Sequence, residues 1–271
     1  MKNEFRNNDA ELRAKYNLDG SDLRKAQLRM TKMLGFIDKV CRDNGIKYWL
    51  DSGTLLGARR HGGFIPWDDD TDICMTREDA KKFKDIMLHN NPSNEFVLQC
   101  RETDKGYFGP WMVLRDLKTE YIQNSELHKK RKYRGLQVDI FPVEDKYVSV
   151  LFVLANKIQS HFIDKPLQRV KNPFLSSILA YPSFYLLHFF IFIFRCVSPR
   201  RNSIRKCFAT PIVWKKISKQ NVFPLDSTIT FEGLELMCPH NVDGYLTEQY
   251  GNWREIPSKI QTHEVLLKFY F

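Results

Sequence analysis

The stretch GFIPWDDDTDICM, residues 63–75, carries four aspartates within five consecutive positions. Carboxylates at such short spacing repel one another, so a folded chain that keeps them together needs a compensating partner nearby. Apolar residues then follow at alternate positions, which is the pattern of a half-buried strand. In a strand over 70–75, the side chains of Asp70 and Asp72 point toward the same face of the sheet, because strand side chains alternate. The stretch therefore predicts a strand with paired carboxylates on one face.

Paired carboxylates are stable on one strand face when a cation lies between them. Oxygen ligands at neighbouring positions suit Mg²⁺, with Mn²⁺ as the alternative ion, and Mg²⁺ sites combine one or two carboxylates with substrate phosphates. A further carboxylate, Asp139, stands between apolar neighbours in the strand-like run LQVDIF, so it also needs a partner. Two plainer alternatives stay open, an Asp-rich turn for the cluster and a salt bridge to an arginine for Asp139.

The acidic cluster lies in a basic protein. Lys and Arg number 42 against 32 Asp and Glu, which gives a net charge of +10. Such a surface attracts phosphates, nucleic acids or anionic lipid. The chain has 271 residues, of which 43% are apolar. It is therefore long enough for one large domain or two small ones with a sizeable core, which argues against global disorder.

The six cysteines form no CxxC pair and no zinc-like spacing. This usage predicts reduced, mostly buried thiols in a cytosolic compartment. The first residues, MKNEFRNNDAELR, contain no apolar core, so we expect no signal peptide.

Helix and strand signals mix along the chain without the regular alternation of a doubly wound sheet. Ser21 and Gly45 frame an apolar stripe at helical spacing, and Thr76 with Asp79 forms a capping pair for another helix. SGTLLG at 52–57 predicts a small-residue turn, with a short helix beginning at LLGARR. The other predicted elements are a helix over 21–44, strands over 46–51, 70–75, 95–100, 110–116 and 136–141, a hairpin over 227–239 and a helix over 241–251. Together they predict an α+β core with a mixed sheet.

Residues 172–194 contain no Lys, Arg, Asp or Glu, and their centre reads SFYLLHFFIFIF. Such a segment is long enough to span a bilayer. Basic residues flank it on both sides, which suits an anionic membrane surface. These flanking residues are Lys165, Arg169, Lys171, Arg195, Arg200, Arg201, Arg205 and Lys206. A buried helical pair in a soluble domain is the alternative, and the pattern leaves open whether the segment spans the membrane, docks on it or avoids it.

The motifs occur in a specific order: a strand, a Ser-Gly-Thr turn, an Asp-x-Asp strand and a lone Asp on a later strand. This order resembles the nucleotidyltransferase-type fold, which carries two-metal phosphoryl chemistry. LDSGTLLGARRHGGFIPWDDDTDICMTREDAKKF (50–83) resembles the signature of the LicD family. The resemblance continues through LRDLKTEYI (114–122), GLQVDIFPVED (135–145) and YLTEQYGNWREIP (245–257). It implies transfer of phosphocholine from CDP-choline to sugars of cell-surface glycans, while related members move other phosphoalcohols such as ribitol phosphate.

The resemblance implies roles for the acidic residues. Asp70 and Asp72 bind the metal ions, and Asp139 completes the site and takes the proton from the acceptor hydroxyl as a general base. Asp68 is a further metal ligand or supports the others from behind. Asp69 points away from the pair and is structural.

Substrate-binding residues are implied in the same way. Gly53 and Thr54 hold the donor phosphate, for which the turn offers backbone N–H groups. Arg59 and Arg60 add positive charge there. The family commonly has a lysine where Val113 stands, so the resemblance leaves three alternatives: Arg59 substitutes for it, Arg115 does, or the donor differs.

A choline head group favours an aromatic cage, and Trp67 is a candidate for it. Tyr48, Tyr107 and Trp111 are further candidates, although aromatic residues of this kind more often pack in the core.

Composition and resemblance together divide the chain into three parts. We predict a nucleotidyltransferase-like catalytic core over 1–145 and an apolar, basic helical insertion over 146–225 that is a candidate for membrane docking. Residues 226–271 complete the catalytic domain. The predicted fold is thus α+β, with a mixed sheet, flanking helices and a hydrophobic helical insertion.

The predicted function is Mg²⁺-dependent transfer of phosphocholine from CDP-choline to a glycan or lipid-linked glycan of the lipopolysaccharide, teichoic acid or capsule type. CDP-ribitol, CDP-glycerol and CDP-ethanolamine are the alternative donors. We expect the protein in the cytoplasm, peripheral on the inner face of the membrane, and without a nucleic-acid partner. A non-catalytic basic protein that binds membrane or nucleic acid is the alternative of another class. It explains the charge but not the three spaced aspartates.

Overall fold

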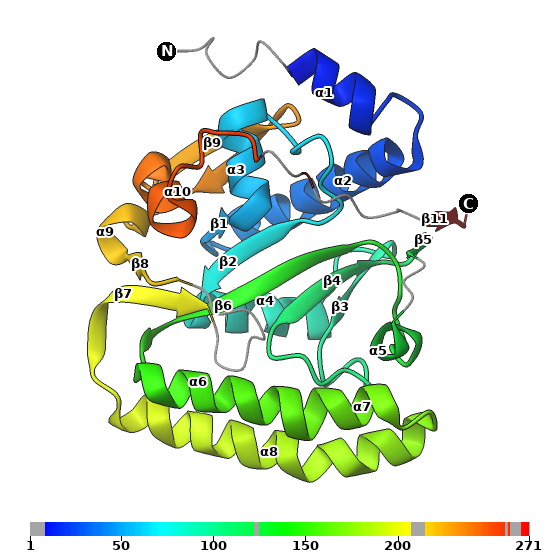
Figure 1. Ribbon diagram of the computed structural model, residues 1–271, viewed down its shortest axis with the longest axis vertical. Coiled ribbons are helices and arrows are strands. Elements are labelled where there is room, and N and C mark those ends of the chain that lie inside the picture. Colours follow the sequence, from blue (N-terminus) through cyan, green and yellow to red (C-terminus); the bar gives the residue numbers. More distant parts are fainter. Residues whose placement is uncertain (1–8, 122–124, 207–214, 258–259, 261–266, 271) are drawn as a thin grey trace.

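The computed structural model describes residues 9–121, 125–206, 215–257, 260 and 267–270 (Figure 1). Its centre is a mixed sheet in the order β1-β2-β6-β4-β3, in which β2 and β6 are parallel and the other neighbours are antiparallel. The strands are β1 (Tyr48–Leu50), β2 (Asp72–Thr76), β3 (Phe96–Gln99), β4 (Met112–Asp116) and β6 (Gln137–Lys146). The predicted α+β class with a mixed sheet and flanking helices is confirmed.

One face of this sheet is apolar. Ile73 lies opposite Ile140 and Leu98 lies opposite Leu114, and all four side chains are fully buried. Tyr48 points the same way and donates a hydrogen bond of 2.8 Å to Asp38 on a covering helix. Two long helices pack against the sheet, and they are α2 (Asp22–Asp43) and α4 (Arg77–His89).

The helix starts predicted from capping residues are confirmed. Ser21 accepts a hydrogen bond of 3.2 Å from the backbone N–H of Arg24 at the start of α2. Thr76 accepts one of 3.1 Å from the backbone N–H of Asp79 at the start of α4. Both contacts satisfy backbone donors that have no partner inside the helix.

The predicted turn over 52–57 is wrong, because helix α3 (Ser52–His61) already begins at Ser52. The backbone N–H of Leu55 donates to the carbonyl of Asp51 at 3.0 Å, so the first helical hydrogen bond forms at once after β1. The buried side chains of Leu55 and Leu56 hold this helix in the core. Small residues at a helix start were therefore mistaken for a turn.

The predicted C-terminal hairpin and helix are confirmed. β9 (Ser227–Phe231) and β10 (Leu234–Cys238) form the predicted hairpin, and its turn residues Glu232 and Gly233 both have positive φ. Helix α10 (Val242–Tyr250) follows. The remaining described elements are α1 (Asp9–Tyr16), β5 (Thr119–Tyr121), α5 (Glu126–Lys129), α9 (Lys219–Val222) and β11 (Leu267–Phe269).

The predicted insertion contains a helical hairpin that crosses the lower edge of the molecule in Figure 1. Its first arm is a continuous helical run and its second arm is a single long helix. These elements are α6 (Ser149–Ile158), η1 (Gln159–Asp164), α7 (Lys165–Arg169) and α8 (Pro173–Val197). Buried residues of the two arms form a hydrophobic cluster separate from the main core. Within the described residues, α8 is the one helix long and apolar enough to cross a membrane by length and composition.

The chain returns from the hairpin directly into the sheet. β7 (Arg200–Lys206) pairs with the second half of β6, and β8 (Ile217–Ser218) pairs with β7. This pairing accompanies the greater length of β6, which was predicted only over 136–141. The predicted domain boundaries stay a prediction, but the strand that ends the hairpin belongs to the core sheet.

Candidate active site

Two of the predicted catalytic carboxylates are neighbours in the sheet. Asp72, the first residue of β2, lies directly opposite Asp139 of β6. The backbone N–H of Asp139 donates to the carbonyl of Thr71 at 2.9 Å, which fixes this register. Residues opposite each other in a ladder point to the same face, so both carboxyl groups stand on the face away from Ile73 and Ile140. The parallel pairing of β2 and β6 thus brings together two carboxylates that are distant in sequence.

Burial and mutual repulsion keep these two carboxyl groups easy to protonate. Burial, together with the charges of Asp70 and Asp51, raises the pKa of Asp72 to about 7, against the opposing charge of the Lys206 ammonium group. Burial and the Asp72 charge raise the pKa of Asp139 to about 6, against the opposing charge of Arg115. Adjacent carboxylates with raised pKa values are typical of functional sites and of cation sites.

The remaining aspartates of the cluster lie in the segment before β2. The strand begins at Asp72, two residues later than predicted, and Asp70 is exposed just ahead of it. Burial and the charge of Asp70 raise the pKa of Asp68 well above its usual range. Asp69 accepts a hydrogen bond of 2.6 Å from the Tyr121 hydroxyl. Asp68, Asp70 and Asp72 therefore form one electrostatic group, whereas the Asp69 side chain is held by a neighbouring strand.

The start of α3 lies against this group. A Cβ atom added to Gly53 would come within 2.5 Å of an Asp68 carboxylate oxygen, so a larger residue at this position would displace the Asp68 side chain. The Thr54 hydroxyl accepts a hydrogen bond of 2.8 Å from the backbone N–H of Asp72. The hydrogen bond of Thr54 thus links the start of α3 to the start of β2. The predicted contact of Gly53 and Thr54 with the donor phosphate stays a prediction.

Two of the predicted cationic residues, Arg59 and Arg60, bind different groups in the C-terminal part of the chain. Arg59 forms an ion pair of 2.7 Å with Asp243 of α10. Arg60 is buried and donates to the backbone carbonyls of Trp253 and Glu255 at 3.2 and 3.3 Å. Both arginines therefore tie α3 to the C-terminal part of the chain.

Arg115 is fully buried on the face that carries Asp139. It donates hydrogen bonds to the Gln99 side chain at 2.8 Å and to the carbonyl of Gly135 at 2.9 Å. Its Nη2 group has no hydrogen-bond partner within the described part of the chain. Burial lowers the pKa of Arg115 to about 10, so the group stays protonated at neutral pH. An unpaired N–H group beside the carboxylates suits an anionic ligand.

The aromatic residues predicted as candidates for a choline cage pack mainly against other parts of the protein. Trp67 packs partly against the main core, and its ring meets that of Tyr16 edge-on at 5.4 Å between centroids. Tyr48 and Tyr107 are buried, and Trp111 lies beside Phe141. The choline cage stays a prediction.

A buried ion pair adjoins the carboxylates, and sequence reasoning missed it. The Lys206 ammonium group of β7 pairs with the Asp51 carboxylate and donates a hydrogen bond of 2.9 Å to the Ser52 hydroxyl. Tyr245 of α10 donates to the other Asp51 oxygen at 2.7 Å. Lys206 was predicted as part of the basic flank of the apolar segment, but it is only 5% exposed and faces the core. No short-range pattern links it to Asp51, because β7 reaches the site only through sheet pairing.

The donor set suits a magnesium-type ion. The clustered ligand atoms are carboxylate oxygens, which hard divalent cations prefer. Within the described ranges, no three Asp, Glu, His or Cys side chains already converge to hold an ion. Mg²⁺ commonly uses one or two carboxylates and completes its coordination with substrate phosphates and water. The paired Asp72 and Asp139 therefore fit an ion that shares its ligands with a phosphorylated substrate.

Comparison with known proteins agrees with this geometry. Residues 45–182, which contain both carboxylates, match the family described as LicD/FKTN/FKRP, nucleotidyltransferase domain. The chain belongs to the LicD family. The predicted family resemblance is confirmed.

Three relatives illustrate the range of this family. The chain is 26% identical to the lipopolysaccharide cholinephosphotransferase LicD of Haemophilus influenzae, over 87% of this chain and 92% of that protein. It is 41% identical to an uncharacterized protein of Rickettsia prowazekii, over 48% of this chain and 54% of that protein. It is 57% identical to the ribitol 5-phosphate transferase FKRP of Mus musculus, over 34% of this chain and 18% of that protein.

Proposed function

We propose that this LicD-family protein transfers phosphocholine from CDP-choline to a sugar of a cell-surface glycan. Membership of the LicD family supports an enzyme that transfers a phosphoalcohol, because the named relatives are a cholinephosphotransferase and a ribitol 5-phosphate transferase. The observation that carries the catalytic assignment is the side-by-side placement of Asp72 and Asp139 on one sheet face. Near-complete coverage of the Haemophilus influenzae relative favours choline as the alcohol and a lipopolysaccharide-type glycan as the acceptor.

The carboxylates bind the metal and prepare the acceptor in this proposal. Mg²⁺ or Mn²⁺, held by Asp70, Asp72 and Asp139 with Asp68 beside them, would offset negative charge on the transferred phosphoryl group and on the departing nucleotide. Asp139 accepts the proton of the acceptor hydroxyl. Burial and the Asp72 charge raise its pKa to about 6 in the metal-free protein, so this carboxylate is more basic than an ordinary aspartate.

The cationic and backbone groups bind the donor. Gly53 and Thr54 offer N–H groups at the start of α3, where the helix dipole also favours an anion. Arg115 contributes its unpaired N–H group, and Arg59 and Arg60 add positive charge at the other end of α3. Together these groups would orient the donor phosphates beside the paired carboxylates.

The cytoplasm is the compartment that fits these features. The described cysteines are free thiols, and four of them are buried, as expected in a reducing compartment. The CDP-linked donor and the glycan acceptor would then meet at the inner face of the membrane.

Another phosphoalcohol is the second candidate. The match to the ribitol 5-phosphate transferase of Mus musculus favours ribitol phosphate over glycerol or ethanolamine phosphate. The fold and the carboxylates would act in the same way on either donor, so the difference lies in the head-group contacts.

Release of CMP tests the proposal. Purified protein is incubated with CDP-choline, Mg²⁺ and a glycan–lipid extract, beside the variants Asp72→Ala and Asp85→Ala. Asp85 is an exposed aspartate of α4 and serves as the matched control. We expect CMP from the wild type and from Asp85→Ala but not from Asp72→Ala.

CDP-ribitol, CDP-glycerol and CDP-ethanolamine are then compared as donors. Equal CMP release by Asp72→Ala, or no release with any of the four donors, would contradict the proposal and favour a non-catalytic binding protein.

A further inference from the structure

Helix α8 presents a long apolar face to the outside of the molecule. Phe174, Ile178, Phe189 and Phe192 are each exposed over at least half of their surface. They lie on the side of the helix opposite the buried Ser176, Ala180, Phe184, Leu187 and Ile191. The first arm of the hairpin adds exposed apolar side chains, including Val150 and Phe162. Soluble surfaces rarely expose so large an apolar patch without a binding partner.

The charged residues of α8 and of its flanks in the sequence have a single sign. Between residues 165 and 225 the chain contains eleven Lys and Arg residues and no Asp or Glu. Exposed cations stand at both ends of α8, and they are Arg169 and Lys171 before it and Arg200 and Arg201 after it. An apolar helix face bounded by cations is complementary to an anionic lipid surface.

The packing of the hairpin favours an in-plane orientation over a span. The buried residues of α8 run from Ser176 to Ile191, about two-thirds of the helix, and α8 contacts all three elements of the first arm. At the hairpin tip, Lys130 of the core donates hydrogen bonds to the carbonyls of Leu167 and Val170. At the other end, the chain enters β7 and pairs with β6. Both ends of α8 are therefore held on the catalytic domain, whereas a span would place them on opposite sides of the bilayer.

The middle of α8 is also attached to the core. The Arg101 guanidinium group lies 4.1 Å from the Phe108 ring centroid and 5.4 Å from that of Tyr181. Phe108 in turn meets the Phe184 ring edge-on at 5.4 Å. These contacts hold α8 as the outermost layer of the molecule, parallel to its lower edge (Figure 1).

We propose that the hairpin over 149–197 docks the protein on an anionic bilayer, with α8 lying in the plane of the interface and its exposed face inserted between the lipid head groups. This docking is independent of the donor and of catalysis. It would hold the sheet and its carboxylates at a fixed height above the lipid.

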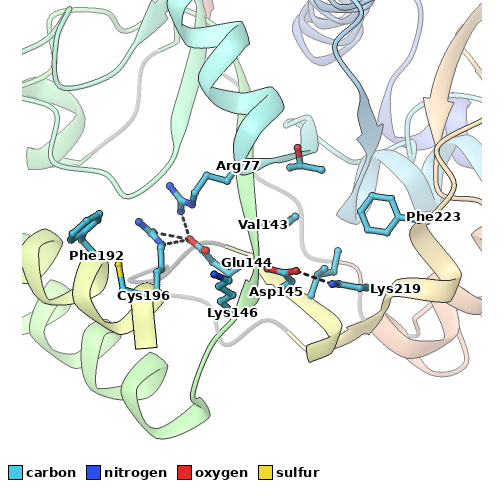
Figure 2. A pocket seen from close by; sticks show the side chains of 12 residues that line it. Arg77, Val143, Glu144, Asp145, Lys146, Phe192, Cys196, Lys219 and Phe223 are labelled. Carbon is cyan, nitrogen blue, oxygen red and sulfur yellow. Dashed lines mark hydrogen bonds and ion pairs between the residues drawn. The ribbon is translucent and has the colours of Figure 1, made fainter. Parts of the chain in front are cut away.

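A cavity at one end of α8 agrees with an anionic lipid (Figure 2). It has a volume of about 570 Å³, and the exposed Phe192 and Cys196 of α8 form part of its wall. Its charged lining comprises four cations and two carboxylates, namely Arg77, Lys146, Arg195, Lys219, Glu144 and Asp145. Arg77 and Arg195 share Glu144, so the lining keeps a net positive charge after this pairing. A lipid phosphate beside this end of the helix would meet that charge.

Vesicle sedimentation tests the docking. The probes are vesicles of pure phosphatidylcholine and vesicles with equal parts of phosphatidylglycerol and phosphatidylcholine. We expect strong binding to the anionic vesicles and weak binding to the neutral ones. Arg200→Ser with Arg201→Ser should weaken anionic binding about 30-fold, since each cation near the surface contributes roughly a five-fold factor. The matched control is Lys39→Ser with Lys47→Ser, two exposed cations away from the hairpin, which should bind as the wild type does.

The apolar face is tested separately. Phe174→Ser with Phe189→Ser should reduce binding at least ten-fold, because two aromatic side chains no longer enter the interface. Leu18→Ser with Leu28→Ser removes two exposed apolar side chains that lie outside the hairpin, one just before α2 and one in it, and should change nothing. Thermal unfolding of each variant shows that the fold is kept. Unchanged vesicle binding in both the cationic and the aromatic variant would overturn the proposal, as would a stable dimer that forms through these phenylalanines and ignores vesicles.

Labelling distinguishes docking in the plane from a span. Lys171→Cys and Arg201→Cys, each in a Cys196→Ser background, place a thiol at either end of α8. With protein bound outside sealed vesicles, a membrane-impermeant maleimide should label both positions equally. Protection of one end that is removed when detergent opens the vesicles would establish a span and overturn the in-plane orientation.

Discussion

The Lys206 ammonium group forms a buried ion pair with the Asp51 carboxylate beside Asp72, one of the predicted catalytic aspartates. Although burial opposes both ionised forms, the pair lowers the pKa of Asp51 and raises that of Lys206. Lys206 also opposes the protonation of Asp72. One cation at the end of β7 thus compensates for two carboxylates, Asp51 at the start of α3 and Asp72 of β2.

Removal of this cation should destabilise the protein strongly. We expect Lys206→Met to lower the free energy of unfolding by about 3–5 kcal/mol, because it leaves the buried Asp51 charge without a partner. The measurement is urea unfolding at neutral pH. Lys206→Met combined with Asp51→Asn should be more stable than Lys206→Met alone. A double variant as unstable as the sum of the two single variants would show that the residues do not interact.

The contribution of Asp72 and Asp139 to the stability of the metal-free protein should fall as the pH rises. Burial raises the pKa of Asp72 to about 7 and that of Asp139 to about 6. The folded state therefore binds protons more tightly than the unfolded state, and this contribution is complete below about pH 4 and is lost as the pH passes about 7. We expect the free energy of unfolding without metal to fall by roughly 2–5 kcal/mol over this window. Asp72→Asn should flatten the dependence, and an equally steep fall in this variant would assign the effect to other groups.

Added Mg²⁺ should reverse this loss. Ligand carboxylates bind the ion in their ionised form, so Mg²⁺ should raise Tm more near pH 8 than near pH 5. Asp139→Asn should abolish most of the increase, whereas Asp85→Asn on α4 should keep it. An equal rise at both pH values would argue against binding by these carboxylates.

Gly53 should not tolerate a methyl group. In Gly53→Ala the new Cβ would meet the Asp68 carboxylate at 2.5 Å, so this side chain has to move away from the cluster. We expect about a ten-fold loss in kcat/KM with little change in overall fold. Gly35→Ala is the matched control in α2, where the nearest atom lies at an ordinary 3.4 Å and alanine favours the helix. Full activity of Gly53→Ala would show that the position of Asp68 is unimportant.

Arg59 should affect the donor more than the fold. Its ion pair with Asp243 is partly exposed, so Arg59→Ala should change the free energy of unfolding by less than about 1 kcal/mol. We expect KM for the donor to rise about ten-fold, because the proposed contact with the donor phosphate would be lost. Asp243→Asn removes the same ion pair but keeps the arginine, and its KM should not rise. Equal KM increases in the two variants would assign the effect to the ion pair itself.

Local signals predicted much of the fold. The caps at Ser21 and Thr76 and the turn at Glu232 and Gly233 act within a few residues, and the structure confirms each of them. The start of α3 was missed because Ser52 and Gly53 are as common in turns as at helix starts. Its helical form depends on the burial of residues further along the helix.

The candidate site was predictable only in part. The spacing of Asp70 and Asp72 and the apolar surroundings of Asp139 identified the carboxylates before their pairing was known. Lys206 was assigned to the membrane flank because its neighbours in sequence are basic. Its place beside Asp51 follows from the pairing of β7 with β6, a long-range contact that leaves no periodic trace in the chain.

The position of β7 after the hairpin sets the order in which the site is assembled during synthesis. The ribosome delivers the aspartates of β2 and β6 first, then the apolar hairpin, and only afterwards the lysine that compensates for them. A nascent chain that stops before Lys206 holds its acidic residues without their buried counter-charge. The site is therefore complete only after the apolar hairpin has left the ribosome and β7 has paired with β6. A chain truncated within the hairpin would still contain Asp70, Asp72 and Asp139 but would lack Lys206.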